Sequence, residues 1–113
     1  MLTLQLPEEE IKVKFKFAER EDGIRTTTCE MFDSQKNCLV ESVASCNPKD
    51  HFSRVEGRKY AFNKAVWSLS WAMFGVAPYQ NYSLNIRDED VPLSKKWRKE
   101  MWNAYFALPM KTR

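Results

Sequence analysis

The chain has 113 residues, of which 43% are hydrophobic and 13% aromatic, and its formal net charge is +3. This length is typical of one domain with a hydrophobic core, and the composition excludes a disordered chain. Residues 1–56 carry 8 Lys or Arg and 11 Asp or Glu, whereas residues 57–113 carry 10 and 4. The positive charge is concentrated in the C-terminal half, which favours an anionic partner.

Several other classes of protein are excluded. The longest uncharged apolar run, residues 65–77, is shorter than the roughly 20 residues that a helix needs to span a bilayer. The N-terminus has no basic region followed by a long apolar run, so we expect no secretory signal. The three cysteines, Cys29, Cys38 and Cys46, do not have the number or spacing of a disulfide framework or a metal site. We therefore expect a cytoplasmic protein, and the sequence leaves open whether any of the three thiols is reactive.

The N-terminal half predicts an antiparallel sheet. Residues 1–10 form an N-terminal arm in which alternating leucines allow a short strand. Residues 11–17 alternate strictly between apolar side chains and lysine, which predicts a half-buried strand. Two more strands are expected at 24–32 and 38–46, after turns at 21–23 and 33–37. Residues 11–46 therefore form a meander of three strands, or four with the arm, and small residues in the last strand leave room for a helix.

The C-terminal half predicts two helices. Ser53 and Glu56 match a capping box that begins a helix over 54–74, and Gly75 ends it. This helix is apolar nearly all round, so one side is expected on the sheet and the other against a C-terminal helix or a second subunit. After a connection at 79–93 with an extended piece at 82–86, Ser94 is expected to cap a final helix over 94–108. The chain is thus predicted to be one α+β domain over 1–113, and a homo-oligomer.

Residues 46–65 contain the strongest candidate site. Three cations gather at the start of the long helix, where backbone amides already attract anions: Arg54, Arg58 and Lys59. The two arginines are expected to clamp a phosphate, and Lys59 adds a point charge. Asp50 can orient an arginine, while His51 and Phe52 can stack on a base. Gly57 allows a backbone or a ligand to approach closely.

The same segment also has an architectural interpretation. Asp50 and Arg54 can simply pair with each other, with Phe52 packed as a hydrophobic staple. Two further groups of cations have similar alternatives, because each is either an anion-binding patch or a solvated face. They are the row Lys12, Lys14 and Lys16 on the first long strand, and the secondary basic patch Lys95, Lys96 and Lys99 on the last helix.

The sequence contains no familiar catalytic motif. His51 is the only histidine, which excludes His-rich zinc sites, and no Walker A, GxSxG, HExxH or GxGxxG pattern is present. Two weaker hypotheses remain: a Cys46–His51 dyad, and a metal-dependent nuclease built on Glu30, Glu41 and Asp50. We therefore expect a non-enzymatic protein with no catalytic residues, no metal and no cofactor.

The motif Cys46-x3-Asp50-x-Phe52-x-Arg54-x2-Gly57-Arg58-Lys59-x-Ala61-x3-Ala65, preceded by Val43-Ala44, resembles one found in small phage and prophage proteins of unassigned activity. The later spacing Arg98-x3-Trp102-x2-Tyr105 is similar to the tail of several such proteins. The resemblance implies an accessory protein that acts in a bacterial host, against host machinery or bacterial defence. It implies a partner that is a protein, a nucleic acid or a signalling nucleotide.

Two hypotheses follow for the function. The first is a non-enzymatic phage-type accessory protein that binds nucleic acid or a nucleotide at Arg54, Arg58 and Lys59. The second is a phage-encoded inhibitor that binds a host or defence enzyme through exposed aromatic helix faces, with the motif at 46–65 serving only the architecture.

Overall fold

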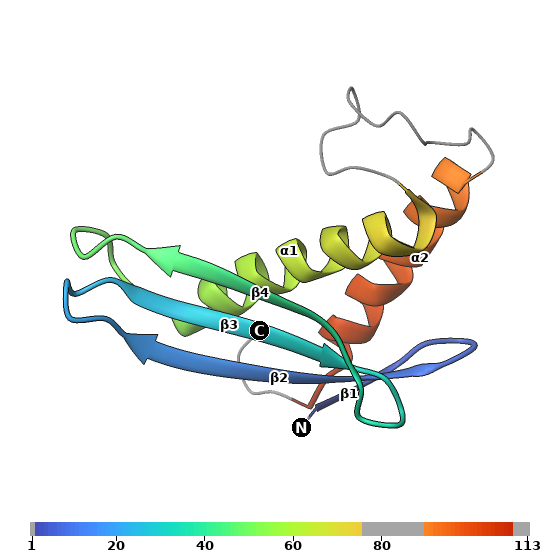
Figure 1. The fold of residues 1–113 in the computed structure, drawn as a ribbon, viewed down its shortest axis with the longest axis horizontal. Helices are drawn as coiled ribbons and strands as arrows, with labels where there is room; N and C mark the ends of the chain where they lie inside the picture. Colours follow the sequence, from blue (N-terminus) through green and yellow to red (C-terminus); the bar gives the residue numbers. More distant parts are fainter. Residues whose placement is uncertain (1, 76–89, 110–113) are drawn as a thin grey trace.

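The computed structural model describes residues 2–75 and 90–109, and only the backbone of residues 90–92. The extended piece predicted at 82–86 and the basic tail from residue 111 lie outside the described residues. The fold is α+β as predicted, with a four-stranded antiparallel sheet followed in the chain by two helices (Figure 1). Within the described residues, no helix is long and apolar enough to cross a membrane.

The sheet is a meander in which each strand pairs with the next. Its strands are β1 (Leu2–Gln5), β2 (Glu10–Glu19), β3 (Arg25–Phe32) and β4 (Cys38–Cys46). The β2–β3 hairpin turns at Gly23, whose φ of +83° favours glycine. In the β3–β4 turn, the Asp33 carboxylate accepts hydrogen bonds from the amides of Asn37 and Gln35, which lower the pKa of Asp33 below its ordinary value.

The two faces of the sheet differ as the alternation predicts. One face is buried under the helices and carries Ile11 and Val13 from β2. On β4 this face carries Ser42 and Ala44, whose small side chains let a helix lie close, as expected. The opposite face carries the lysine row of β2, so the three ammonium groups lie away from the core.

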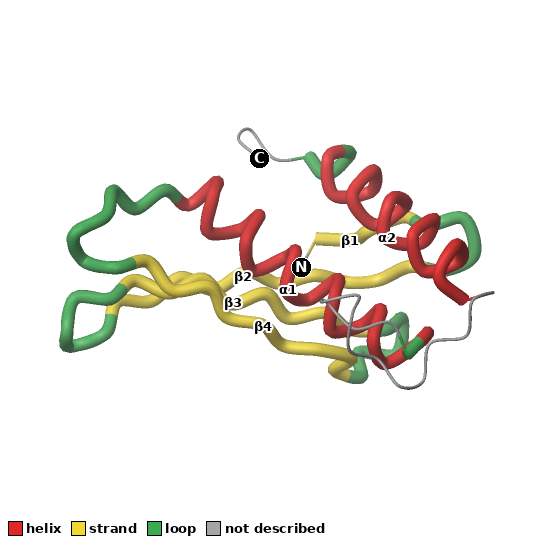
Figure 2. Tube along the Cα trace, turned by 90° about the horizontal axis from the view of Figure 1, so that it is seen from above, coloured by secondary structure: helices red, strands yellow, loops and turns green. Residues whose placement is uncertain are grey.

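Helix α1 spans Arg54–Phe74, the bounds that the sequence predicts. The Ser53 hydroxyl accepts a hydrogen bond from the Glu56 amide at 3.4 Å, and Gly75 ends the helix in the left-handed conformation. Seen from above, α1 crosses β3 and β4, while α2 lies over β1 (Figure 2). Gly57 sits where α1 packs against β3: a Cβ there would overlap Oγ1 of Thr27 and lie 3.3 Å from its Cβ. The space beside Gly57 is therefore occupied by Thr27 of the sheet and not left open for a ligand.

Helix α2 spans Asp90–Phe106 and begins four residues before the predicted start. The prediction that Ser94 caps this helix is wrong, because Ser94 lies inside it and is fully buried. Its hydroxyl hydrogen-bonds to that of Ser70 on α1 and accepts from Nη1 of Arg98 at 2.7 Å. The Arg98 guanidinium also lies 3.9 Å from the ring centroid of Trp67, so it joins the two helices. Burial lowers the pKa of Arg98 from its ordinary value.

The core lies between the sheet and the helix pair. Phe62 of α1 packs 4.6 Å from Tyr105 and 4.8 Å from Trp102 of α2, measured between ring centroids. Tyr105 in turn meets Phe15 of β2 edge-on at 6.4 Å. The predicted burial of α1 on a second side is thus provided by α2 of the same chain.

Candidate functional site

The candidate site lies at the end of the sheet where the β2–β3 hairpin, the loop 47–53 and the first turn of α1 meet (Figure 1). A cavity of about 530 Å³ opens there, within the range typical of ligand pockets. Its lining comes from three separate parts of the chain: Phe17, Ala18, Glu19, Arg25, Phe52 and Arg54. The sheet and the helix therefore bring together residues that lie up to 37 positions apart in the sequence.

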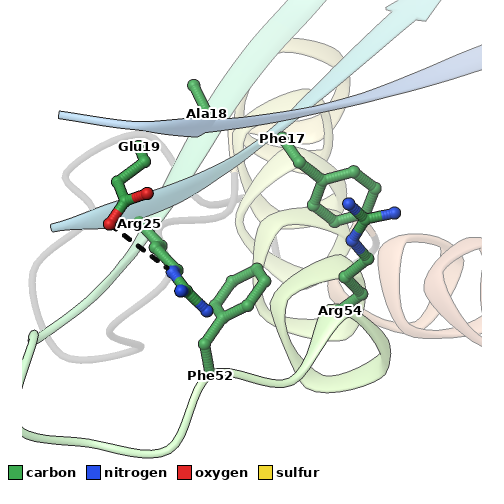
Figure 3. A pocket seen from close by; sticks show the side chains of 6 residues that line it. All are labelled: Phe17, Ala18, Glu19, Arg25, Phe52 and Arg54. Carbon is green, nitrogen blue, oxygen red and sulfur yellow. Dashed lines mark ion pairs between the residues drawn. The ribbon is translucent and has the colours of Figure 1, made fainter. Parts of the chain in front are cut away.

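Two arginines in this cavity each lie over a phenylalanine ring. The Arg54 guanidinium carbon is 4.8 Å from the centroid of Phe17, and that of Arg25 is 5.4 Å from the centroid of Phe52 (Figure 3). The two rings meet each other edge to face at 6.4 Å. Such contacts contribute roughly 0.5–1 kcal/mol each at exposed sites and favour a guanidinium placed over the face of a ring. The result is a pair of oriented cations around two aromatic faces.

The cations outweigh the one carboxylate that lines the cavity. Glu19 approaches Nε of Arg25 at 3.9 Å, near the limit for an ion pair, and both side chains are at least half exposed. Such a pair contributes little. The predicted alternative in which Asp50 pairs with Arg54 is not seen, since neither side chain forms an ion pair within the described part of the chain. The guanidinium of Arg54 is thus oriented by Phe17 rather than by a carboxylate.

The three predicted cations do not lie together in one cavity. Arg54 lines the cavity, and Arg58 is half-buried with its guanidinium carbon 6.0 Å from the centroid of Phe17. Lys59 points elsewhere, because its ammonium lies 5.9 Å from the ring centroid of Phe106 on α2. Arg54 therefore faces the cavity, Arg58 supports the same ring, and Lys59 belongs to the helix pair.

The remaining predicted residues line two smaller cavities beside the first. Asp50, His51 and Phe52 all take part in both, with volumes of about 280 and 350 Å³. Phe52 and Arg25 line all three cavities, so these two side chains stand at the centre of the recess.

The two weaker catalytic hypotheses stay predictions. Cys46 and His51 line the same two smaller cavities. The Cys46 thiol donates weak hydrogen bonds to the carbonyl oxygens of Asn47 at 3.6 Å and Asp50 at 4.0 Å, both in the loop that follows β4. Glu30 and Glu41 face each other across β3 and β4, whereas Asp50 is in the loop beyond the sheet end. Among the described residues, no group of three or more His, Cys, Asp or Glu is placed to hold a metal ion.

The other two basic groups lie apart from this recess. Lys95, Lys96 and Lys99 are exposed on α2, and Lys96 lines a separate cavity together with Glu8, Glu9 and Glu100. On the open sheet face, Lys16 pairs with Glu30 at 2.7 Å, and the hydrogen bond raises the pKa of Lys16. Each group therefore includes a lysine with acidic side chains nearby.

Sequence reasoning missed Arg25 and Phe17. Phe17 belongs to the apolar face of the half-buried strand predicted at 11–17, while Arg25 stands alone beside a run of threonines. The pairing of Glu19 with Arg25 across the hairpin, which the turn at Gly23 fixes, was the signal that would have placed Arg25 at the sheet end.

Comparisons with family models, curated proteins and solved structures gave no match to this chain. The resemblance to phage and prophage proteins therefore stays a prediction, and the function is argued below from the residues of the site.

Proposed function

We propose that the protein binds nucleic acid or a nucleotide in the recess around Phe52, and that it does so as a non-enzymatic accessory protein. The observation that carries this proposal is the pair of arginine–phenylalanine stacks, Arg54 on Phe17 and Arg25 on Phe52, in one cavity. The phage resemblance would place this activity in the cytoplasm of a bacterial host.

The chemistry of the two stacks suits a nucleotide. A guanidinium presents paired N–H donors that match two phosphate oxygens, and a ring that already orients it reduces the entropy lost on binding. Bases stack on aromatic faces without strong sequence preference, each contributing roughly 1–3 kcal/mol. Phosphate bound by the arginines and a base stacked on an aromatic ring that lines the recess would therefore use both kinds of side chain.

Binding of a fluorescently labelled single-stranded oligonucleotide, followed by anisotropy, tests the proposal. Arg25→Ala and Arg54→Ala are each expected to weaken binding at least tenfold and to reduce its salt dependence, because each removes a phosphate contact. Arg20→Ala is the matched control: it removes the same charge from the same hairpin, but Arg20 pairs with Asp22 at 2.9 Å. Equal effects of all three changes would mean that only general charge matters, and they would contradict the assignment of the recess as the binding site.

A second candidate is a protein-binding inhibitor of a host or anti-phage defence enzyme. It is favoured by the packing of Gly57 on Thr27, which makes part of the motif architectural, and by three exposed apolar side chains on α1. These are Tyr60, Trp71 and Met73. Tyr60 and Trp71 share one helix face, and this face would also serve the predicted homo-oligomer. A complex with a defined host enzyme that survives Arg25→Ala but is lost in Trp71→Glu would favour this candidate over nucleotide binding.

A further inference from the structure

The recess has a second half with a different chemical character. The cavity of about 280 Å³ on the α1 side of Phe52 shares Arg25 and Phe52 with the larger one. Its other lining includes two carboxylates, Asp50 and Glu56, and the hydroxyl groups of Ser45 and Tyr60. One half of the recess is therefore rich in cations and the other is rich in hydrogen-bond acceptors.

The two carboxylates are available to a ligand. Neither Asp50 nor Glu56 forms an ion pair within the described residues. Glu56 is the better placed of the two, because it is fixed in the first turn of α1 by the Ser53 cap, whereas Asp50 is in a loop. Tyr60 follows one turn later on the same helix face, lines the same cavity and is 64% exposed. A carboxylate and an open aromatic ring thus stand side by side at the cavity mouth.

A nucleotide that bridges the two halves needs a base with N–H donors on its outer edge. A carboxylate only accepts hydrogen bonds, and its two oxygens match two parallel donors. Among the common bases, only guanine presents two neighbouring donors, N1–H and the N2 amino group, on its Watson–Crick edge. Adenine, cytosine and uracil each place an acceptor beside their donor, and this acceptor would face a carboxylate oxygen at an energetic cost.

We propose that this second cavity reads guanine: Glu56 accepts from N1–H and N2–H, Tyr60 stacks on the base, and Arg25 holds its phosphate. This inference rests on the proposed function and adds base specificity to it. A free guanine nucleotide and a guanine in single-stranded nucleic acid present the same edge, so both fit.

Isothermal titration with GMP, AMP, CMP and UMP, and with labelled single strands that contain or lack one guanine, tests the proposal. Guanine is expected to bind about 10- to 100-fold more tightly than the other bases, the discrimination typical of one bidentate contact. Glu56→Gln should remove this preference while leaving affinity for adenine unchanged. Glu41→Gln, on the open sheet face, is the matched control and should keep the preference. Preference seen only with strands would identify nucleic acid rather than free nucleotide as the source of the guanine.

The outcomes separate the two proposals. Binding that depends on Arg25 and Arg54 but is equal for all bases would overturn the guanine assignment and leave nucleotide binding standing. A guanine preference that persists in Glu56→Gln would also overturn it. No binding of any nucleotide or strand would overturn both. Far-UV circular dichroism of each variant shows that lost binding is not lost folding.

Discussion

At Gly57, the lack of a side chain decides how closely α1 approaches the sheet. Alanine there gains roughly 1 kcal/mol of helix propensity, but its Cβ would overlap Oγ1 of Thr27. Because Thr27 is buried and its backbone is held in β3, the overlap cannot be relieved cheaply. We expect Gly57→Ala to lower the free energy of unfolding by about 1–3 kcal/mol, measured by urea denaturation.

The double variant Gly57→Ala with Thr27→Ala provides the control. Removing the threonine hydroxyl and methyl makes space for the new Cβ, so the double variant should be more stable than the sum of the single effects indicates. Additive effects of the two changes would contradict the contact between Gly57 and Thr27 as the cause.

The different burial of Cys29 and Cys38 predicts different thiol reactivity, a point that the sequence leaves open. Cys29 is fully buried, and desolvation raises the pKa of its thiol to about 12, whereas Cys38 is exposed. A raised pKa keeps the Cys29 thiol protonated and unreactive at pH 8. Iodoacetamide followed by mass spectrometry should therefore modify Cys38 in the folded protein and Cys29 only after denaturation. Fast modification of Cys29 in the native state would contradict its burial.

The strongest sequence signal located only part of the site. Asp50, His51, Phe52 and Arg54 could be predicted as site residues, because they lie within a few positions of one another in the loop and at the start of the helix. Arg25 joins them only through the pairing of β2 with β3, and a lone strand arginine carries no local signal. Contacts between distant segments of this kind depend on register, which a single sequence specifies weakly at exposed positions.

At the scale of elements, Arg98 is the main polar link between the two helices. It donates to Ser94 at 2.7 Å and to Ser70 at 3.3 Å, and it stacks on Trp67. Arg98→Ala would leave the buried hydroxyl groups of Ser70 and Ser94 with one donor fewer, so we expect a loss of about 1–2 kcal/mol. Thermal unfolding should show this loss, whereas Lys99→Ala on the exposed face of α2 should change stability by less than about 0.5 kcal/mol.

Lysine at position 98 sharpens this test. It keeps the charge but loses the flat guanidinium and its paired donors, so Arg98→Lys should not restore full stability. Wild-type stability in Arg98→Ala would show that the serine pair holds the helices together without the arginine. The positions Arg98, Trp102 and Tyr105, which resemble phage protein tails, all lie at this helix contact and have a clear packing role.

Elements with both local signals and periodicity were predicted best. Helix α1 has its cap at Ser53 and its stop at Gly75, and its bounds are confirmed; β4 is confirmed as well. The start of α2 was wrong because Ser94 has the chemistry of a cap, yet the helix begins at Asp90. Pro92 is tolerated within the first turn, where its missing amide would have no partner in the helix. Local chemistry at Ser94 was thus overridden by its burial against Ser70.

For the whole molecule, the fold places the three groups of basic side chains on separate surfaces. The helices cover one face of the sheet (Figure 1). The recess is lined by residues from the end of the sheet where β2 and β3 are joined. The lysine row lies on the open face, and the second basic patch lies on α2. Binding of an anionic partner at the recess can therefore be distinguished in space from general attraction to either of the other surfaces.

The measurement that tests nucleotide binding at the recess most directly is an NMR titration of the ¹⁵N-labelled protein with a short single strand. The Nε–Hε signals of Arg25 and Arg54 and the amides of residues 50–57 should shift together and saturate at one ratio. Signals of the lysine row and of Lys95, Lys96 and Lys99 should shift little. Shifts confined to those lysines, or no shifts at all, would contradict the assignment of the recess as the binding site.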